Sequence, residues 1–148
     1  MFAVGAVAVL AIGASVASAA CPPRAKTVFS CLTAAGKRIE VCDAGQTIDY
    51  SFGSPNAKPE IVVRAPRRAA TTYQWPGAGR HFSYSVDVPN DNTVYSVYWS
   101  ADRMGAEPDA KGGVIVSIDG RERGTVRCAH GQDIVQNIEG IDLAPTPP

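Results

Sequence analysis

The side chains able to do covalent or metal chemistry in this chain are four cysteines and two histidines: Cys21, Cys31, Cys42, Cys128, His81 and His130. No two cysteines have CxxC spacing, so a four-ligand zinc site would have to be assembled from scattered positions. The uncharged, apolar first twenty residues predict export, and in an oxidising compartment an even number of cysteines is most simply explained by two disulfides. We therefore predict two disulfides and no metal site.

The sequence leaves the pairing of these cysteines open, because four cysteines allow three connectivities. Cys31 and Cys42 flank the segment FSCLTAAGKRIEVC, and a hairpin centred at Gly36-Lys37 would place them opposite each other. Cys21 and Cys128 would then join the ends of the chain. The alternative pairs Cys128 with Cys31 or Cys42, and nothing local excludes it.

Motifs of known hydrolase classes are absent. The chain has no GxSxG, SxxK or HExxH, and the acidic segment DRMGAEPDAKG lacks the ligand spacing of an EF-hand. His81 is expected on the polar face of a strand, and His130 comes just after the last cysteine. No carboxylate pair stands out for glycoside cleavage. We predict no catalytic residue and no cofactor, and hence a protein that is not an enzyme.

Aromatic, glycine and arginine residues gather near two expected loops. Trp, Tyr and Arg dominate the energetics of protein interfaces. The predicted partner-binding residues are therefore Trp75, Gly77, Arg80 and Tyr98. The competing interpretation is that Trp99 and some of the tyrosines belong to the core.

Short runs in which apolar and polar residues alternate, separated by turn residues, predict the strands that carry these side chains. Apolar residues alternate with polar ones in QTIDYSFG and again in RHFSYSVDV, where Phe82, Tyr84, Val86 and Val88 are expected to face inward. Residues 80–99 predict one hairpin, and GGVIVSIDG with RGTVRC predicts a second. EIVVRA predicts a further strand, whereas residues 65–79 and 100–112 are expected to be long connections.

The predicted fold is an all-β, antiparallel single domain of about eight strands with two disulfides. A small barrel is favoured, and a β-sandwich is the alternative. We expect the β domain to span residues 21–140, followed by a flexible tail at residues 141–148. The order of the strands and the oligomeric state do not follow from the sequence.

The first twenty residues, MFAVGAVAVLAIGASVASAA, predict a signal peptide. They are uncharged, apolar, and end in small residues, although a basic start is missing. Their Ala and Gly content argues against a stable membrane span, and Ser18 argues against a lipoprotein processed at Cys21. The expected location is periplasmic or secreted. Fourteen basic and fourteen acidic residues cancel, so nucleic acid is a poor candidate partner.

Two resemblances add to this picture. The segments FSC, GKRIEVC, YSFG, PEIVV, GGVIVSIDG and TVRC together resemble a group of small bacterial exported proteins, which implies no activity. FSC near the mature start, a Gly-Ala loop, Tyr98-Trp99 and a late cysteine are similar to the periplasmic C-type lysozyme inhibitors. That family implies an eight-stranded barrel that plugs the lysozyme cleft with a loop. In the matching stretch, PGAGRHFSY, Pro76 stands where the family has Ser, and there is no Tyr at the fitting place. After Tyr98-Trp99, Asp102 stands where the family has a Lys.

The resulting hypothesis is a non-enzymatic exported binding protein with a protein partner. A lysozyme or another cell-wall hydrolase is the candidate partner, contacted through the loop at residues 65–80. The alternative is a structural or accessory module of the envelope without a ligand site.

Overall fold

The computed structural model describes residues 21–105 and 109–148, so the predicted signal peptide at residues 1–20 lies outside the described residues. The described part contains eleven strands and one short 3-10 turn, η1 (Arg67–Ala69). The strands are β1 (Lys26–Leu32), β2 (Arg38–Asp43), β3 (Thr47–Gly53), β4 (Ile61–Pro66), β5 (Thr71–Gln74), β6 (His81–Asn90), β7 (Thr93–Asp102), β8 (Lys111–Ile118), β9 (Arg121–Arg127), β10 (Val135–Gln136) and β11 (Ala144–Pro145).

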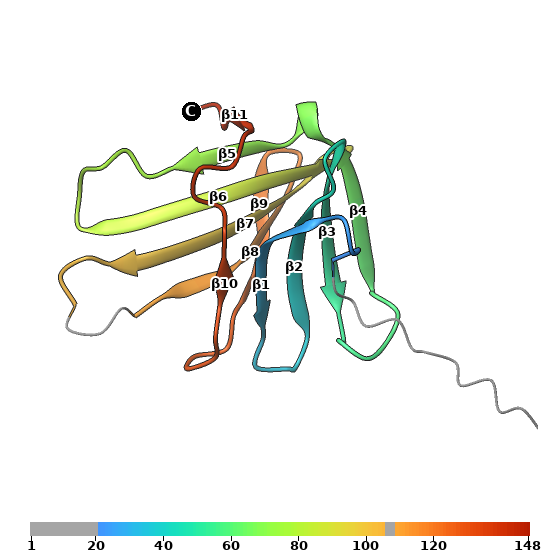
Figure 1. Ribbon diagram of the computed structural model, residues 1–148, viewed down its shortest axis with the longest axis horizontal. Helices are drawn as coiled ribbons and strands as arrows, with labels where there is room; N and C mark the ends of the chain where they lie inside the picture. Colours follow the sequence, from blue (N-terminus) through green and yellow to red (C-terminus); the bar gives the residue numbers. More distant parts are fainter. Residues whose placement is uncertain (1–20, 106–108) are drawn as a thin grey trace, which may run out of the picture.

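These strands form two sheets that pack face to face. The first sheet has the order β10-β1-β2-β3-β4 and the second the order β11-β5-β6-β7-β8-β9. Figure 1 shows the strands of the first sheet running across those of the second, an arrangement found in orthogonal sandwiches. The all-β prediction is therefore confirmed.

The prediction of a closed barrel is wrong, and the sandwich alternative fits. The turn η1 carries the chain from β4, the edge of the first sheet, into the second sheet, whose far edge is β9. In the described chain, the two sheets share no ladder, and the links between them include an isolated bridge between Thr33 and Cys128 and the Cys31–Cys128 disulfide. The sequence could not distinguish the two folds because both need the same short alternating strands.

The predicted alternation of apolar and polar residues is observed in the strands. Ile48 and Tyr50 are buried in β3, and Tyr84, Val86 and Val88 are buried in β6. Phe82, at the outer end of β6, is only partly buried.

The hairpins are also confirmed. Asp91 adopts a positive φ of 52° between β6 and β7, and Asp119-Gly120 adopts φ values of 52° and 73° between β8 and β9. Two consecutive left-handed residues are typical of the tight turns that match the strand twist.

Strand β5 lies inside the stretch that was expected to be a long connection, residues 65–79. Its four residues pair with β6, with Thr72 opposite Val86 and Tyr73 opposite Ser85. The β-branched Thr72 is buried, whereas Tyr73 is exposed. The strand is short, and its signal was hidden by the neighbouring Ala, Pro and Gly residues.

The core lies between the two sheets. Tyr50 of the first sheet stacks on Tyr95 of the second with ring centroids 4.5 Å apart. Ile138, from the segment after β10, is fully buried with them. In Figure 1 this segment continues from β10, beside β1, to β11 at the edge of the second sheet.

The disulfides join Cys21 to Cys42 and Cys31 to Cys128. The favoured pairing of Cys31 with Cys42 is therefore wrong, and the alternative pairing of Cys128 with Cys31 is confirmed. The reason is register: Cys31 lies opposite Ile39, and Cys42 lies opposite Thr27. The turn is centred nearer β1 than expected, so Cys31 and Cys42 point to opposite faces of the first sheet.

The last residues, for which the sequence indicates a flexible tail, run beside β5. Ala144 and Pro145 pair with it in parallel as β11. The Arg67 guanidinium donates to the Asp142 carbonyl at 2.9 Å and to Asp43 Oδ1 at 2.7 Å, so it connects this segment to the first sheet. No helix among the described residues is long and apolar enough to cross a membrane.

Candidate functional site

Trp75 lies just after β5 and packs inward. Its ring meets Phe82 edge to face with centroids 4.6 Å apart, and the Arg103 guanidinium lies 5.0 Å from its centroid. The indole Nε1–H donates to the Ala78 carbonyl at 2.8 Å. Both the polar group and one ring face of Trp75 are thus used within the protein, and the exposed Gly77, with φ 89°, lets the loop turn around them.

Arg80 is held in a bidentate ion pair at the end of the same loop. Its Nε and Nη2 donate to Asp102, with distances of 2.7 to 3.0 Å. Hydrogen bonds from Arg80 and from the Met104 backbone, followed by the charges of Arg80 and His81, lower the pKa of Asp102 to about 2. Because the charge of Arg80 is already matched, the loop offers little unpaired charge to a partner.

Tyr98 lies on the opposite face of the second sheet from Trp75. Its neighbour Val97 is fully buried between the sheets, so Tyr98 points away from the core. The structure therefore brings Trp75, Gly77 and Arg80 together at one loop and places Tyr98 elsewhere.

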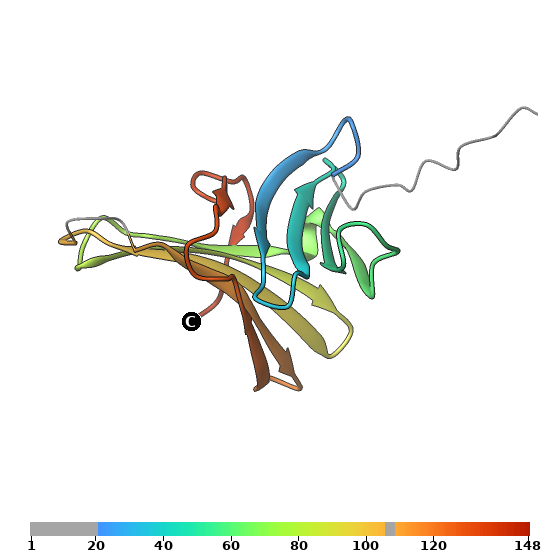
Figure 2. The ribbon, with the colours of Figure 1, turned by 90° about the horizontal axis from the view of Figure 1, so that it is seen from below.

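We call the surface around Tyr98 the outer face: the side of the second sheet turned away from the first sheet. In Figure 2 the first sheet and the segment around β10 lie on the other side of the second sheet. No layer of the described chain covers the outer face, and Thr146 touches only its edge, at Thr71 and Asp87.

One row of residues crosses the outer face from β5 to β9. Strand register places Tyr73, Ser85, Tyr98, Gly113 and Arg127 side by side. Tyr73 is 46% exposed, and Tyr98 is partly exposed. The neighbouring rows add further small hydroxyl side chains, namely Thr71, Ser83, Ser96, Ser100 and Thr125.

The two histidines do not form a catalytic pair with a serine. His81 is exposed and lies opposite Asp102 in the β6–β7 ladder, whereas His130 is exposed in a turn after β9. Neither makes a hydrogen bond or ion pair with another described residue. Ser100 lines a cavity with each of them, but among the described residues no hydrogen bond joins an imidazole to a serine hydroxyl.

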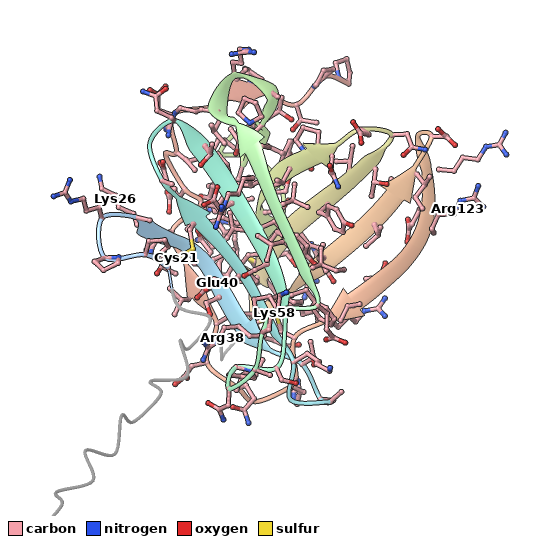
Figure 3. The ribbon with its side chains drawn as sticks, turned by 90° about the vertical axis from the view of Figure 1, so that its right-hand side faces the viewer. Cys21, Lys26, Arg38, Glu40, Lys58 and Arg123 are labelled. Carbon is pink, nitrogen blue, oxygen red and sulfur yellow. A yellow bond between two sulfur atoms is a disulfide. The ribbon has the colours of Figure 1, made fainter. Side chains whose placement is uncertain are left out.

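The remaining cluster with ligand-type side chains lies on the first sheet. Ligand atoms of Cys21, Glu40 and Cys42 lie within 4.8 Å of one another, and Figure 3 shows Cys21 and Glu40 on the face turned away from the core. Both sulfurs are joined in a disulfide, so neither offers a thiolate to a metal. Burial raises the pKa of Glu40, against the opposing charge of Arg38.

Comparison of the chain with protein-family models, with curated proteins and with solved structures found no match. The site must therefore be judged on its geometry.

The sequence did not lead us to predict that the residues from Tyr73 to Arg127 form one row. The prediction included Tyr98 but not Tyr73 or Ser85, which share its face. The signal was present, because the β6–β7 hairpin places Ser85 opposite Tyr98. The pairing of Tyr73 with Ser85, however, depends on β5, which was not predicted.

Proposed function

We propose that this protein is an exported binding protein without catalytic activity, which contacts a protein partner through the outer face. The observation that carries the proposal is the row from Tyr73 to Arg127, in which tyrosines alternate with small residues on an uncovered sheet. Surfaces rich in Tyr, Ser and Gly are typical of dedicated binding sites. Tyrosine supplies rigid contact area at low entropic cost, and serine supplies adaptable hydrogen bonds.

The area of the outer face suits such a role. Its longest strands have ten residues, at about 3.3 Å each, and five strands lie about 4.8 Å apart. A face of this kind measures at most roughly 800 Å², which is one partner's share of a standard interface. Because ladder hydrogen bonds hold the backbone that carries these side chains in place, binding would order little additional chain.

Export of the protein is supported by its disulfides and its first twenty residues. Two disulfides are typical of oxidising compartments such as the periplasm or the cell exterior. The uncharged apolar start of the chain fits a signal peptide. A partner in the cell envelope is therefore the natural choice.

A lysozyme-type hydrolase is the partner class to test first, because of the resemblance to the C-type lysozyme inhibitors. In that family a loop fills the cleft. Here the corresponding loop is engaged by the Arg80–Asp102 and Trp75–Arg103 contacts, which favours the outer face as the contact surface.

Lytic assays with c-type lysozyme test this version directly. We expect the disulfide-bonded protein to abolish lysis at micromolar concentration. Tyr98→Ala should weaken inhibition roughly thirtyfold, since a hot-spot tyrosine contributes about 2 kcal/mol or more. Val62→Ala, on the exposed face of the first sheet, is the matched control and should leave inhibition unchanged. Unimpaired lysis at micromolar protein would exclude lysozyme as the partner.

The alternative, an accessory module that joins a larger assembly by its sheet edges, is less well supported. Among the described strands, the long edge strands are β4 and β9, and the other two edges, β10 and β11, have only two residues each. The side chain of Arg64 on β4 is 73% exposed, and β9 carries the exposed Arg121, Arg123 and Arg127. Charged residues of this kind protect edges against pairing with another strand.

A further inference from the structure

A small cavity lies at the β9 end of the outer face. Its volume is about 270 Å³. Ligand sites for drug-sized molecules usually measure about 300 to 1,000 Å³, so this one suits a single side chain or a small ion. Its polar lining consists of Tyr98, Ser100, Lys111, Arg127 and His130, and Ala110, Gly112 and Ile134 supply apolar surface.

Tyr98 and Arg127 converge above Gly113, which lies between them in the row. The position that a Cβ of Gly113 would occupy is 3.1 Å from Tyr98 Oη and 3.1 Å from Arg127 Cα. The tyrosine hydroxyl therefore comes close to the base of the arginine side chain. A hydroxyl and a guanidinium at one cavity together offer hydrogen-bond donors to an anion.

The charge of this cavity is positive and incompletely matched. Arg127 has no ion pair within the described part of the chain. Lys111 Nζ lies 4.0 Å from Asp109 Oδ2, so its charge is already shared. Among the described residues, the hydroxyls of Tyr98 and Ser100 also make no hydrogen bond. One spare positive charge beside an aspartate suits a singly charged anion better than a doubly charged one.

We propose that this cavity binds the carboxylate of an acidic side chain on the protein partner. The carboxylate accepts hydrogen bonds from Arg127 and the Tyr98 hydroxyl, as arginine commonly provides for carboxylates. The methylenes of the side chain lie against Gly112 and Ile134. This inference rests on the proposed function, because it assigns the chemistry of the partner at one end of the outer face.

The test is an NMR titration of the intact, disulfide-bonded protein with the blocked peptide acetyl-Gly-Glu-Gly-amide. We expect saturable shifts at Tyr98, Arg127 and His130 with a Kd on the order of 1 mM. The peptide with Gln in place of Glu should cause none of them. Arg127→Gln should weaken binding at least tenfold. Arg123→Gln is the matched control on the same strand, because Arg123 points away from the molecule (Figure 3), and it should leave the Kd within twofold.

Three results would overturn the assignment: equal shifts with the Gln peptide, no shifts at the three residues, or inorganic phosphate binding at least as tightly as the Glu peptide. The titration needs no protein partner. Its failure would therefore remove the carboxylate site alone, whereas failure to bind any partner through the outer face would remove the proposed function.

Discussion

Arg80 and Asp102 are the most strongly coupled charges of the candidate loop, and both are partly or largely exposed. Their fork-like geometry fixes the outer end of the β6–β7 hairpin, together with the hydrogen bond from the Arg103 backbone to the Arg80 carbonyl at 2.9 Å. The pair therefore acts in the structure of the loop. Its charges are less available to a partner than the charge of Arg127.

The pKa of Asp102 provides a direct test of this pair. A carboxylate whose pKa is lowered by folding stabilises the folded state above its unfolded pKa of 3.8, and this stabilisation disappears as the pH falls through about 2. We expect a carboxyl-carbon NMR titration to give about 2 for Asp102 in the native protein. In Arg80→Gln the pKa should rise toward 3.8. An unchanged pKa in the variant would show that Arg80 is not its main cause.

At the scale of the strands, the alternation of side chains explains which residues share a face. Trp99 packs on Tyr84 with centroids 6.0 Å apart, so the adjacent Tyr98 must point outward. The hairpin centred on residues 90–93 also sets the pairing of His81 with Asp102, and hence the closeness of Arg80 to Asp102. Both relations could be predicted from the sequence once the turn was located.

Other relations between elements could not be predicted. The place of β10 beside β1 depends on residues far apart in the chain, such as Phe29 and Gln136. Strand β5 is joined to β6 by the loop at residues 75–80, but its four residues give little periodic signal. Two-residue strands such as β10 and β11 carry no periodicity. The sequence alone therefore does not predict that Tyr73 belongs to the outer face or that Ile138 belongs to the core.

Gly113 lies on β8 and Gly124 on the neighbouring β9. Substituting each of them tests how closely these two strands pack. A Cβ at Gly113 would lie 2.4 Å from the Val126 carbonyl oxygen, whereas a Cβ at Gly124 meets no atom within 4 Å. We expect Gly113→Ala to lower the free energy of unfolding by about 2 kcal/mol. Gly124→Ala should change it by no more than about 0.5 kcal/mol. Chemical denaturation measures both, and equal effects would contradict this packing.

At the scale of the whole molecule, the two disulfides do different things. Cys21–Cys42 pins the start of the described chain onto the first sheet, whereas Cys31–Cys128 connects the two sheets. The number of disulfides could be predicted from the even number of cysteines and the expected export. Their pairing could not, because it depends on a strand register that a shift of one residue reverses.

Removing each disulfide should lower the free energy of unfolding by an amount that grows with the logarithm of the length of the loop it closes. The sequence separations are 21 and 97 residues. Chain entropy then predicts losses of roughly 3.3 kcal/mol for Cys21→Ser with Cys42→Ser, and about 4.7 kcal/mol for Cys31→Ser with Cys128→Ser. Guanidinium unfolding of the two double variants measures the difference. A larger loss for the shorter loop would contradict this account.

The most direct test of the outer face as the binding surface is site-specific photocrosslinking. The probe p-benzoylphenylalanine would replace Tyr73, exposed in the row on the outer face, in one variant and Val62, exposed on the first sheet, in the other. Each variant would be irradiated in an envelope extract of the cells that make the protein. We predict one discrete protein adduct from position 73 and none from position 62. No adduct from position 73, or the same adducts from both positions, would contradict the assignment of the outer face.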